Sequence, residues 1–298
     1  MKKVAPKTKT VNLDFNPKQV VKRLLSSLPI RAQDIINSRF GLAAEKKMTL
    51  EAIGKKYKIT RERVRQIENY ALNHIRKSDV YDKETPAFDN LKKAIRELGM
   101  LISEEELLSI LAKDKMTQNF IHFILVIGKD FNKEKEDEDF KHRWHIDKTI
   151  SDKIHDALKK LYEGLGDDEI MQESEIVASF LEHLKDVSDE YKNDEIITRW
   201  LAVSKNVSKN PLGEWGKSKS SNIKARGVKD YAYLVIRRHG SPVHFKEVAR
   251  LITEVFNKKA HVATTHNELI KDSRFVLVGR GLYALKEWGY STGIVREV

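Results

Sequence analysis

Residues 49–77, TLEAIGKKYKITRERVRQIENYALNHIRK, decide the fold of the first part of the chain. Two amphipathic segments, 50–57 and 61–77, flank a three-residue gap, and this pattern predicts a helix-turn-helix. Thr60 directly precedes the second segment, where its hydroxyl can cap the helix. Gly54 falls where the two helices cross closely, a place that admits only a small side chain. The motif is expected to bury Ile53, Tyr57, Ile59, Val64 and Ile67.

The second helix is expected to begin with the charged residues Arg61, Glu62 and Arg63. In a helix-turn-helix, this end of the second helix enters the DNA major groove. There an Arg pairs with guanine, a Glu accepts a hydrogen bond from cytosine, and a Gln, here Gln66 one turn later, pairs with adenine. Arg65 and the lysines of the first helix are better placed for phosphates. The pattern therefore predicts DNA binding; the alternative is a solvated helix face held by i,i+4 pairs. The residues predicted to contact DNA are Thr49, Lys55, Thr60, Arg61, Glu62, Arg63, Arg65 and Gln66.

The positive charge of the chain lies in its first 80 residues. The 298 residues carry a net charge of +11, with 55 Lys and Arg against 44 Asp and Glu. Residues 1–80 hold 19 of the basic and 7 of the acidic residues, a balance of +12, which leaves −1 for the remainder. A basic region joined to a near-neutral body indicates a polyanionic partner, and nucleic acid is the leading candidate. The alternative is that the charge serves solubility or ribosome affinity.

Composition limits the class of protein. Hydrophobic residues make up 40% and charged residues 33% of the chain, as in a soluble globular protein. No apolar run approaches the ~18 residues of a membrane span, and the start, MKKVAPKTKT, lacks the apolar core of a signal peptide. The absence of cysteine excludes disulfides and thiolate zinc sites and fits a reducing compartment. We therefore expect a cytoplasmic, nucleoid-associated protein with no membrane partner.

Apolar periodicity predicts a mainly α fold in which a helix-turn-helix precedes tandem winged-helix units. Helices are expected across 18–40, broken at Pro29 and closed by Gly41. An order of three helices followed by two strand-like runs begins near residue 86 and restarts near 150 and 230, which indicates a repeated supersecondary unit. In the last copy, 274–278 and 282–285 bracket a Gly-Arg-Gly turn and predict a hairpin. The domains expected are a basic flexible arm at 1–17, the helix-turn-helix at 18–80, winged-helix-like units at 86–147 and 148–212, a Gly/Ser/Lys-rich linker at 213–227 and a winged helix at 228–290.

The run LPIRAQDIINSRFGL (28–42), followed by MTLEAIGKKYKITRERVRQIENYALNHIRK (48–77), closely resembles region 4 of the sigma-70 family of bacterial transcription initiation factors. The resemblance covers about residues 20–77. In that family the region recognises the promoter −35 element and packs on the flap of the RNA polymerase β subunit. The resemblance implies that Arg61, Glu62 and Gln66 meet bases. It also implies that Arg63 and Arg65 lie against the backbone. The polymerase contacts it implies are Leu28, Arg31, Ile35 and Phe40.

Two departures from that family stand out. Lys58 occupies the turn, where Gly, Asn or Asp often eases a left-handed backbone. Full sigma factors also carry an upstream helical region whose aromatic residues melt the promoter, and only about 20 residues precede the match here. We therefore expect a protein that does not by itself act as a complete sigma factor.

A second resemblance covers about residues 229–288. The pieces SPVHFKEVA and GRGLYAL are similar to the HARE-HTH domain, a winged helix. That domain occurs in the delta subunit of some bacterial RNA polymerases, in restriction enzymes and in chromatin proteins. Residues 86–217 resemble only the same helix and strand order.

Catalytic, nucleotide and metal sites are not expected. GEWGKS at 213–218 suggests a phosphate loop, but the first Gly of that motif would fall at position 211, which is Pro. The spacings of His142, His145, His261 and His266 do not match a set of metal ligands, and no nucleophile stands beside a general base. We expect no enzyme activity, cofactor, metal or small-molecule substrate.

The function predicted is a sequence-specific, DNA-binding transcription factor that docks on RNA polymerase. The alternatives are a polymerase adaptor resembling the delta subunit and a DNA-targeting subunit of a restriction-type system.

Overall fold

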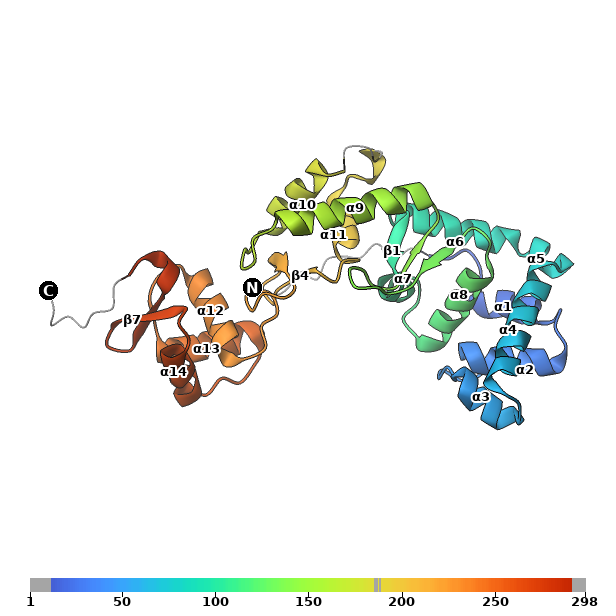
Figure 1. The fold of residues 1–298 in the computed structure, drawn as a ribbon, viewed down its shortest axis with the longest axis horizontal. Coiled ribbons are helices and arrows are strands. Elements are labelled where there is room, and N and C mark those ends of the chain that lie inside the picture. Colours follow the sequence, from blue (N-terminus) through green and yellow to red (C-terminus); the bar gives the residue numbers. More distant parts are fainter. Residues whose placement is uncertain (1–11, 185–186, 188, 291–298) are drawn as a thin grey trace. The chain divides into compact units, whose positions relative to one another are not determined.

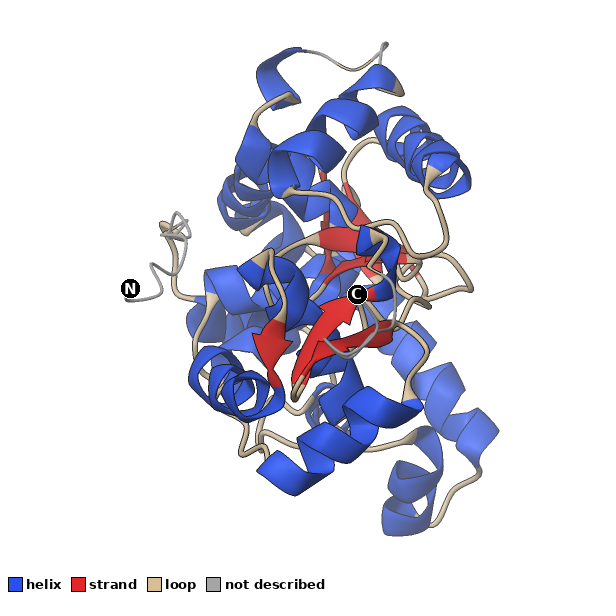
Figure 2. Ribbon diagram, turned by 90° about the vertical axis from the view of Figure 1, so that its left-hand side faces the viewer, coloured by secondary structure: helices blue, strands red, loops and turns tan. Residues whose placement is uncertain are grey.

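The computed structural model describes residues 12–184, 187 and 189–290 (Figure 1). These residues are mainly helical, with three small antiparallel sheets that Figure 2 shows in red. The chain divides into two compact units, the first comprising residues 1–156 and 186–203 and the second residues 157–185 and 204–298. Among the helices described, none is both long and apolar enough to cross a membrane.

Four helices begin the first unit. Asn16 caps the first of them by accepting a hydrogen bond from the Gln19 N–H, and Pro29 stands directly before the second. Gly41 ends the second helix with a φ of 67°, the left-handed conformation that glycine adopts without steric cost. The helices are α1 (Pro17–Leu25), α2 (Ile30–Phe40), α3 (Leu50–Tyr57) and α4 (Arg61–Arg76).

The flexible arm predicted for residues 1–17 is wrong for its described part. Leu13 and Phe15 pack against the hydrophobic core, and the Asn90 amide donates to the Asp14 carboxylate across 2.6 Å. Residues 1–11 lie outside the described part of the chain.

The next elements form a three-stranded sheet with helices around it. Strand order is β1-β3-β2, with Leu101 and Asn132 both opposite His145. The first strand was not predicted, because residues 101–111 were expected to be one helix. Instead Ser103 caps a helix that begins only at Glu104. The elements are α5 (Asp79–Lys83), α6 (Thr85–Glu97), β1 (Leu101–Ser103), α7 (Glu104–Leu111), α8 (Lys115–Ile127), β2 (Asn132–Glu134) and β3 (Arg143–His145).

The helix-turn-helix and the following unit share one hydrophobic core, although they were predicted as separate domains. The sequence of α8 is almost entirely apolar beyond its first turn, and such a helix must be covered on several sides. It packs against α7 and also against α1, α2 and α4. Leu24 and Ile75 from the first four helices therefore lie in the same core as Phe123 and Trp144.

Helix α11 (Asp194–Leu201) belongs to the first unit. The Arg199 guanidinium donates to the Leu98 carbonyl and the Glu106 carboxylate, each at 3.1 Å. The Trp200 indole donates to the Gly99 carbonyl at 2.9 Å. The expected 148–212 unit is thus divided, because α9 (Lys148–Gly164) contributes to both compact units, whereas α10 and the next sheet lie in the second. The remaining elements of this region are α10 (Glu173–Glu182), the 3-10 turn η1 (Asp189–Tyr191), β4 (Val207–Lys209) and β5 (Trp215–Lys217).

The second unit ends in three helices and a sheet of order β6-β8-β7. The hairpin predicted around the Gly-Arg-Gly turn is confirmed, and Gly281 in that turn has a φ of 72°. A short strand before the second helix of this group was not predicted. The elements are α12 (Val228–His239), β6 (Val243–His244), α13 (Phe245–Phe256), α14 (Val262–Lys271), β7 (Phe275–Gly279), β8 (Leu282–Leu285) and the 3-10 turn η2 (Lys286–Trp288).

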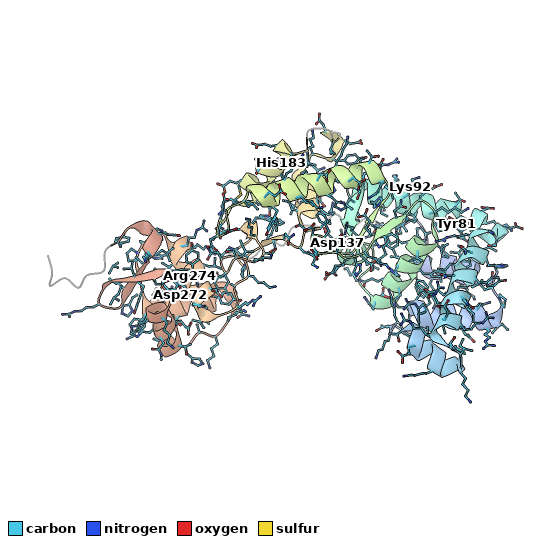
Figure 3. All side chains as sticks on the ribbon, in the orientation of Figure 1. Tyr81, Lys92, Asp137, His183, Asp272 and Arg274 are labelled. Carbon is cyan, nitrogen blue, oxygen red and sulfur yellow. The ribbon has the colours of Figure 1, made fainter. Side chains whose placement is uncertain are left out.

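The predicted linker at 213–227 is wrong. Strand β5 lies within it, and Trp215 and Asn222 are buried. The Arg274 guanidinium donates to the Asn222 side chain at 3.3 Å and pairs with Asp230 at 3.0 Å. It also pairs with Asp272 at 2.8 Å, and Figure 3 labels both of these residues. A composition rich in Gly, Ser and Lys predicted a linker, but here the polar side chains satisfy one another inside the unit.

Candidate nucleic-acid interface

Two threonine caps fix where α3 and α4 begin. The Thr49 hydroxyl accepts a hydrogen bond from the Ala52 N–H, and the Thr60 hydroxyl accepts one from the Arg63 N–H, each at 3.1 Å. Thr60 therefore has the capping role predicted for it. Both threonines are exposed, so their hydroxyl protons stay available to an acceptor such as a phosphate oxygen.

The turn between α3 and α4 is tight. A Cβ on Gly54 would lie 2.7 Å from the Ile59 carbonyl oxygen, so the need for a small side chain is confirmed. The neighbour is the turn backbone rather than a side chain of the second helix. Lys58 adopts φ 54° and ψ 46°, the left-handed conformation that was in question, and its N–H bonds to the Gly54 carbonyl. A lysine there strains the backbone by about 1–2 kcal/mol.

The buried side of the motif fixes the orientation of its charged side. Ile53 and Val64 have no exposed surface and pack with Ile35, while Tyr57 and Ile67 are partly buried against them. Residues three to four apart share a helix face, so the residues between these contacts point away from the core. The exposed residues at the start of α4 are Arg61, Glu62, Arg63, Arg65 and Gln66.

The exposed side chains of α4 are partly organised by one another. Glu62 and Arg65 form a two-contact ion pair, with oxygen–nitrogen distances of 2.6 and 2.8 Å, and this pairing lowers the pKa of Glu62. Arg63 donates to the Gln66 side-chain oxygen at 3.1 Å. Within the described residues, Arg61 has neither an ion pair nor a side-chain hydrogen bond. Arg61 is therefore free to bind a ligand. Glu62 and Gln66 already bond to neighbouring arginines, and a base would have to compete with these contacts.

Lys55 on α3 is held only weakly. Its ammonium lies 3.1 Å from Glu51 one turn earlier, and both side chains are more than two-thirds exposed. Exposed pairs of this kind contribute about 0.3–0.5 kcal/mol. Lys55 can therefore exchange Glu51 for an anionic partner with little loss.

Three of the four residues expected to contact polymerase are core residues. Leu28, Ile35 and Phe40 are buried, and the Phe40 ring packs edge-on against Phe123 with centroids 5.0 Å apart. Side chains with at most 6% of their surface exposed offer a partner almost nothing to contact unless the core opens, so burial contradicts these three assignments. Arg31 is exposed, as its assigned role requires.

Sequence reasoning missed two residues that hold the loop between α2 and α3. Asn119, on α8 and only 1% exposed, donates to the carbonyls of Gly41 and Glu45 at 3.0 and 2.9 Å. His122, one turn later, meets the Lys47 ammonium at 3.3 Å. Both stand in the apolar run NFIHFILVIG, where two polar residues among buried ones were the only available signal.

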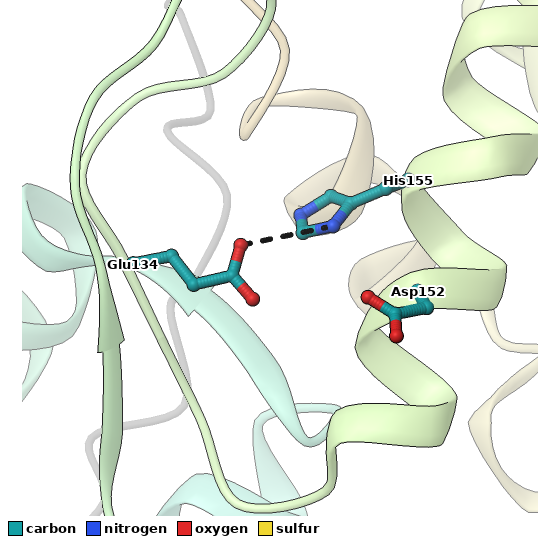
Figure 4. Close-up of side chains that lie close together, drawn as sticks. All are labelled: Glu134, Asp152 and His155. Carbon is teal, nitrogen blue, oxygen red and sulfur yellow. Dashed lines mark ion pairs between the residues drawn. The ribbon is translucent and has the colours of Figure 1, made fainter.

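A cluster of Glu134, Asp152 and His155 brings three possible metal ligands within 4.8 Å of one another (Figure 4). The Glu134 oxygens already lie 2.6 Å from Arg143 and 3.1 Å from Lys148. These two cations already neutralise the Glu134 carboxylate, and Lys148 also pairs with Asp152 at 2.6 Å, so we interpret the cluster as a structural ion-pair network. Burial, with a contribution from Arg143, lowers the pKa of His155 to about 4 and keeps it neutral near pH 7.

Comparisons with known proteins concern the helix-turn-helix. Residues 24–77 match the family model for Sigma-70, region 4. The chain is 41% identical over 59 residues to the RNA polymerase sigma factor SigA of Clostridium acetobutylicum, which covers 20% of this chain and 16% of that protein. It is 46% identical over 56 residues to the sigma factor RpoS of Coxiella burnetii, covering 19% and 16%. It is 44% identical over 59 residues to the chloroplastic sigma factor sigD of Arabidopsis thaliana, covering 20% and 14%. The chain thus spans about one sixth or less of the length of these relatives.

Proposed function

We propose that this protein is a sequence-specific DNA-binding transcription factor of the sigma-70 region 4 type. It recognises −35-like promoter DNA through the first turns of α4 and acts, without enzymatic activity, in transcription initiation or its regulation in the cytoplasm. The observation that carries the proposal is the exposed set at the start of α4, above all the unpaired Arg61, within the segment that matches region 4. The +12 charge of residues 1–80 supports it, because phosphate contacts dominate affinity for DNA.

The division of roles along α4 follows from its geometry. Arg61 has no competing partner within the described residues, so it is the first candidate for a bidentate contact to guanine. Gln66 pairs with adenine after Arg63 releases its side-chain oxygen. Arg65 and Lys55 meet phosphates and thereby position the helix without selecting a sequence.

We also propose that RNA polymerase is a partner, with the flap of its β subunit as the surface. The relatives matched are named RNA polymerase sigma factors, which supports a polymerase partner. On this chain the start of α2 is the better contact, because Ile30 is 78% exposed and Arg31 beside it is exposed too. An Ile30→Ser/Arg31→Ala variant should lose retention on immobilised core polymerase while its DNA affinity stays within twofold.

We propose that residues 229–288 form a HARE-HTH winged helix. The order α12, β6, α13, α14, β7, β8 with a closing hairpin supports this assignment. The first unit has the same order from α6 to β3, but its third helix, α8, is buried and cannot enter a groove. Groove recognition is therefore assigned to α4 alone within the first unit.

The proposal is tested by selecting preferred duplexes from a random pool and then measuring competition binding. Arg61→Ala and Gln66→Ala should each relax the preference at one base pair, by about 1–3 kcal/mol. Arg65→Ala and Lys55→Ala should weaken all duplexes alike. Lys83→Ala, which removes an exposed charge on α5, is the control. If the two groups of variants behave identically, or no sequence is enriched, α4 does not recognise bases.

A further inference from the structure

A buried histidine beneath the α2–α3 loop has a lysine at each ring nitrogen. The Lys47 ammonium lies 3.3 Å from His122 Nδ1, and the Lys133 ammonium lies 3.4 Å from His122 Nε2. A neutral imidazole accepts a hydrogen bond at only one nitrogen and carries a proton on the other. His122 is neutral, since burial, together with the charge of Lys47, lowers its pKa to about 3. The ring therefore satisfies at most one of the two ammonium groups.

The two lysines differ in their other contacts. Lys133 on β2 pairs with the Glu104 carboxylate at 2.5 Å, and that carboxylate also accepts from the Trp144 indole at 2.9 Å. Lys47 has no ion pair with a carboxylate within the described residues, and its partner is the uncharged ring. Glu104 therefore neutralises Lys133, and the charge of Lys47 is left without a paired carboxylate.

Lys115, at the first position of α8, adds a third cation. Its ammonium is 3.5 Å from the Gln118 side chain and has no carboxylate partner in the described part of the chain. Burial is the main cause of a lowered pKa at Lys47, and Lys115 and Lys133 depress it further, whereas Glu104 opposes the shift. Neighbouring ammonium groups of this kind favour the binding of an anion.

The loop that carries Lys47 is fixed before any ligand arrives. Its beginning is held by Asn119 through the Gly41 and Glu45 carbonyls. Its end is held by Arg39, which donates to the Met48 carbonyl at 3.3 Å. A site whose backbone is already ordered loses less conformational entropy on binding.

The cations continue the predicted DNA surface. Lys47 is two residues before Thr49, which caps α3, and α3 connects through the short turn to the reading end of α4. Eight residues of helix span about 12 Å, roughly the distance between phosphates across a few base pairs. In the sequence Lys47 thus adjoins the start of α3, and Lys47 and Lys133 both meet the ring of His122.

We propose that Lys47, Lys115 and Lys133 form a phosphate-binding patch that extends the DNA surface from the helix-turn-helix onto α8 and β2. The ligand is the backbone of double-stranded DNA flanking the recognised sequence. This inference rests on the proposed function. Two of its three residues, Lys115 and Lys133, lie outside the segment that matches region 4. The three lysines can act together because the shared core holds α8 and β2 beside the α2–α3 loop.

The test measures the salt dependence of duplex binding by the full chain. The variant Lys47→Gln/Lys115→Gln/Lys133→Gln removes three charges and keeps polar side chains. Each phosphate contact contributes about 0.9 to the slope of log Kd against log salt, so the slope should fall by roughly 2–3 between 50 and 200 mM salt. Base preference should stay unchanged. Lys83→Gln/Lys93→Gln/Lys160→Gln removes three exposed charges elsewhere and should leave the slope within about 0.5 of wild type.

The outcomes separate this inference from the proposed function. If wild type shows no salt-dependent duplex binding, the proposed function fails. If wild type binds but the patch variant and the control have equal slopes, only the patch is overturned. The single variants Lys47→Gln and Lys115→Gln keep the Lys133–Glu104 pair, so a slope reduced in these two as well excludes misfolding as the cause. Loss of polymerase retention with unchanged DNA slopes would overturn the patch in favour of a protein contact.

Discussion

At the scale of single residues, the turn of the helix-turn-helix is held in a conformation that its residue does not favour. The caps Thr49 and Thr60 were foreseeable from sequence, because a hydroxyl before an apolar period is a local signal. The left-handed backbone of Lys58 could not be predicted from the sequence, since lysine rarely adopts a positive φ. The structure settles that conformation, with Gly54 packed under the turn.

Replacing Lys58 by glycine should stabilise the first unit by about 0.5–1 kcal/mol. Glycine removes the steric cost of the positive φ. Part of this stabilisation is offset because glycine gives the unfolded chain more conformational entropy. Lys58 is exposed and forms no ion pair among the described residues, so few contacts are lost. The measurement is urea unfolding of Lys58→Gly against Lys58→Ala, which keeps the strain. Equal stability of the two variants would show that the turn is relaxed in the native protein.

His155 should make the first unit sensitive to acid. Its pKa is lowered to about 4 by burial, whereas an unfolded histidine titrates near 6.5. Below pH ~6.5 the unfolded chain takes up a proton that the folded one does not, so stability falls as pH decreases towards 4, by up to about 3 kcal/mol. His155→Phe keeps a ring against Phe140, whose centroid is 4.4 Å away, and should remove this share of the acid sensitivity, while the share due to His122 remains. Superimposable pH profiles of wild type and variant would contradict this origin.

At the scale of elements, local patterns and long-range packing contributed differently. The first four helices and the last hairpin follow from apolar periodicity and turn residues, and all of them form. Strand β1 and the position of α11 do not follow from local pattern. Strand β1 needs β3 beside it, and α11 is held by Arg199 and Trp200 bonding to carbonyls about 100 residues away. Leu28 and Phe40 likewise lie in the core that contains α8, which no pattern in 18–80 indicates, whereas Ile35 packs with Ile53 and Val64 of the helix-turn-helix itself.

Asn119 connects α8 to the α2–α3 loop, and its replacement should destabilise that loop. Asn119→Ala leaves the Gly41 and Glu45 carbonyls without their partner and should cost about 1–3 kcal/mol. Amide hydrogen exchange should accelerate across residues 41–48. Asn73→Ala, at an exposed position on α4, is the matched control and should change neither quantity. Unchanged exchange in the loop of the Asn119 variant would mean that the loop is ordered independently of α8.

At the scale of the whole molecule, the helix-turn-helix depends on the residues that follow it. Val20 and Leu24 on α1, and Ala71 and Ile75 on α4, are buried in the core that contains α8. A fragment ending at residue 80 would expose them, so it is a poor surrogate for the helix-turn-helix as it stands in the full chain. The relatives matched share only this segment, and the residues that cover it here lie beyond the match.

The shared core predicts that damage within α8 unfolds the helix-turn-helix as well. Phe123 has no exposed surface and contacts Phe40, so Phe123→Ala in the full chain should destabilise the first unit by about 3–5 kcal/mol. Hydrogen exchange should then lose protection in α4 and α8 together, because one cooperative unit opens as a whole. Leu234→Ala, equally buried on α12 of the second unit, removes a comparable side chain and should leave α4 protected. Protection of α4 that survives Phe123→Ala would show that the helix-turn-helix folds as an independent domain, and the rigid coupling on which the phosphate patch depends would then be absent.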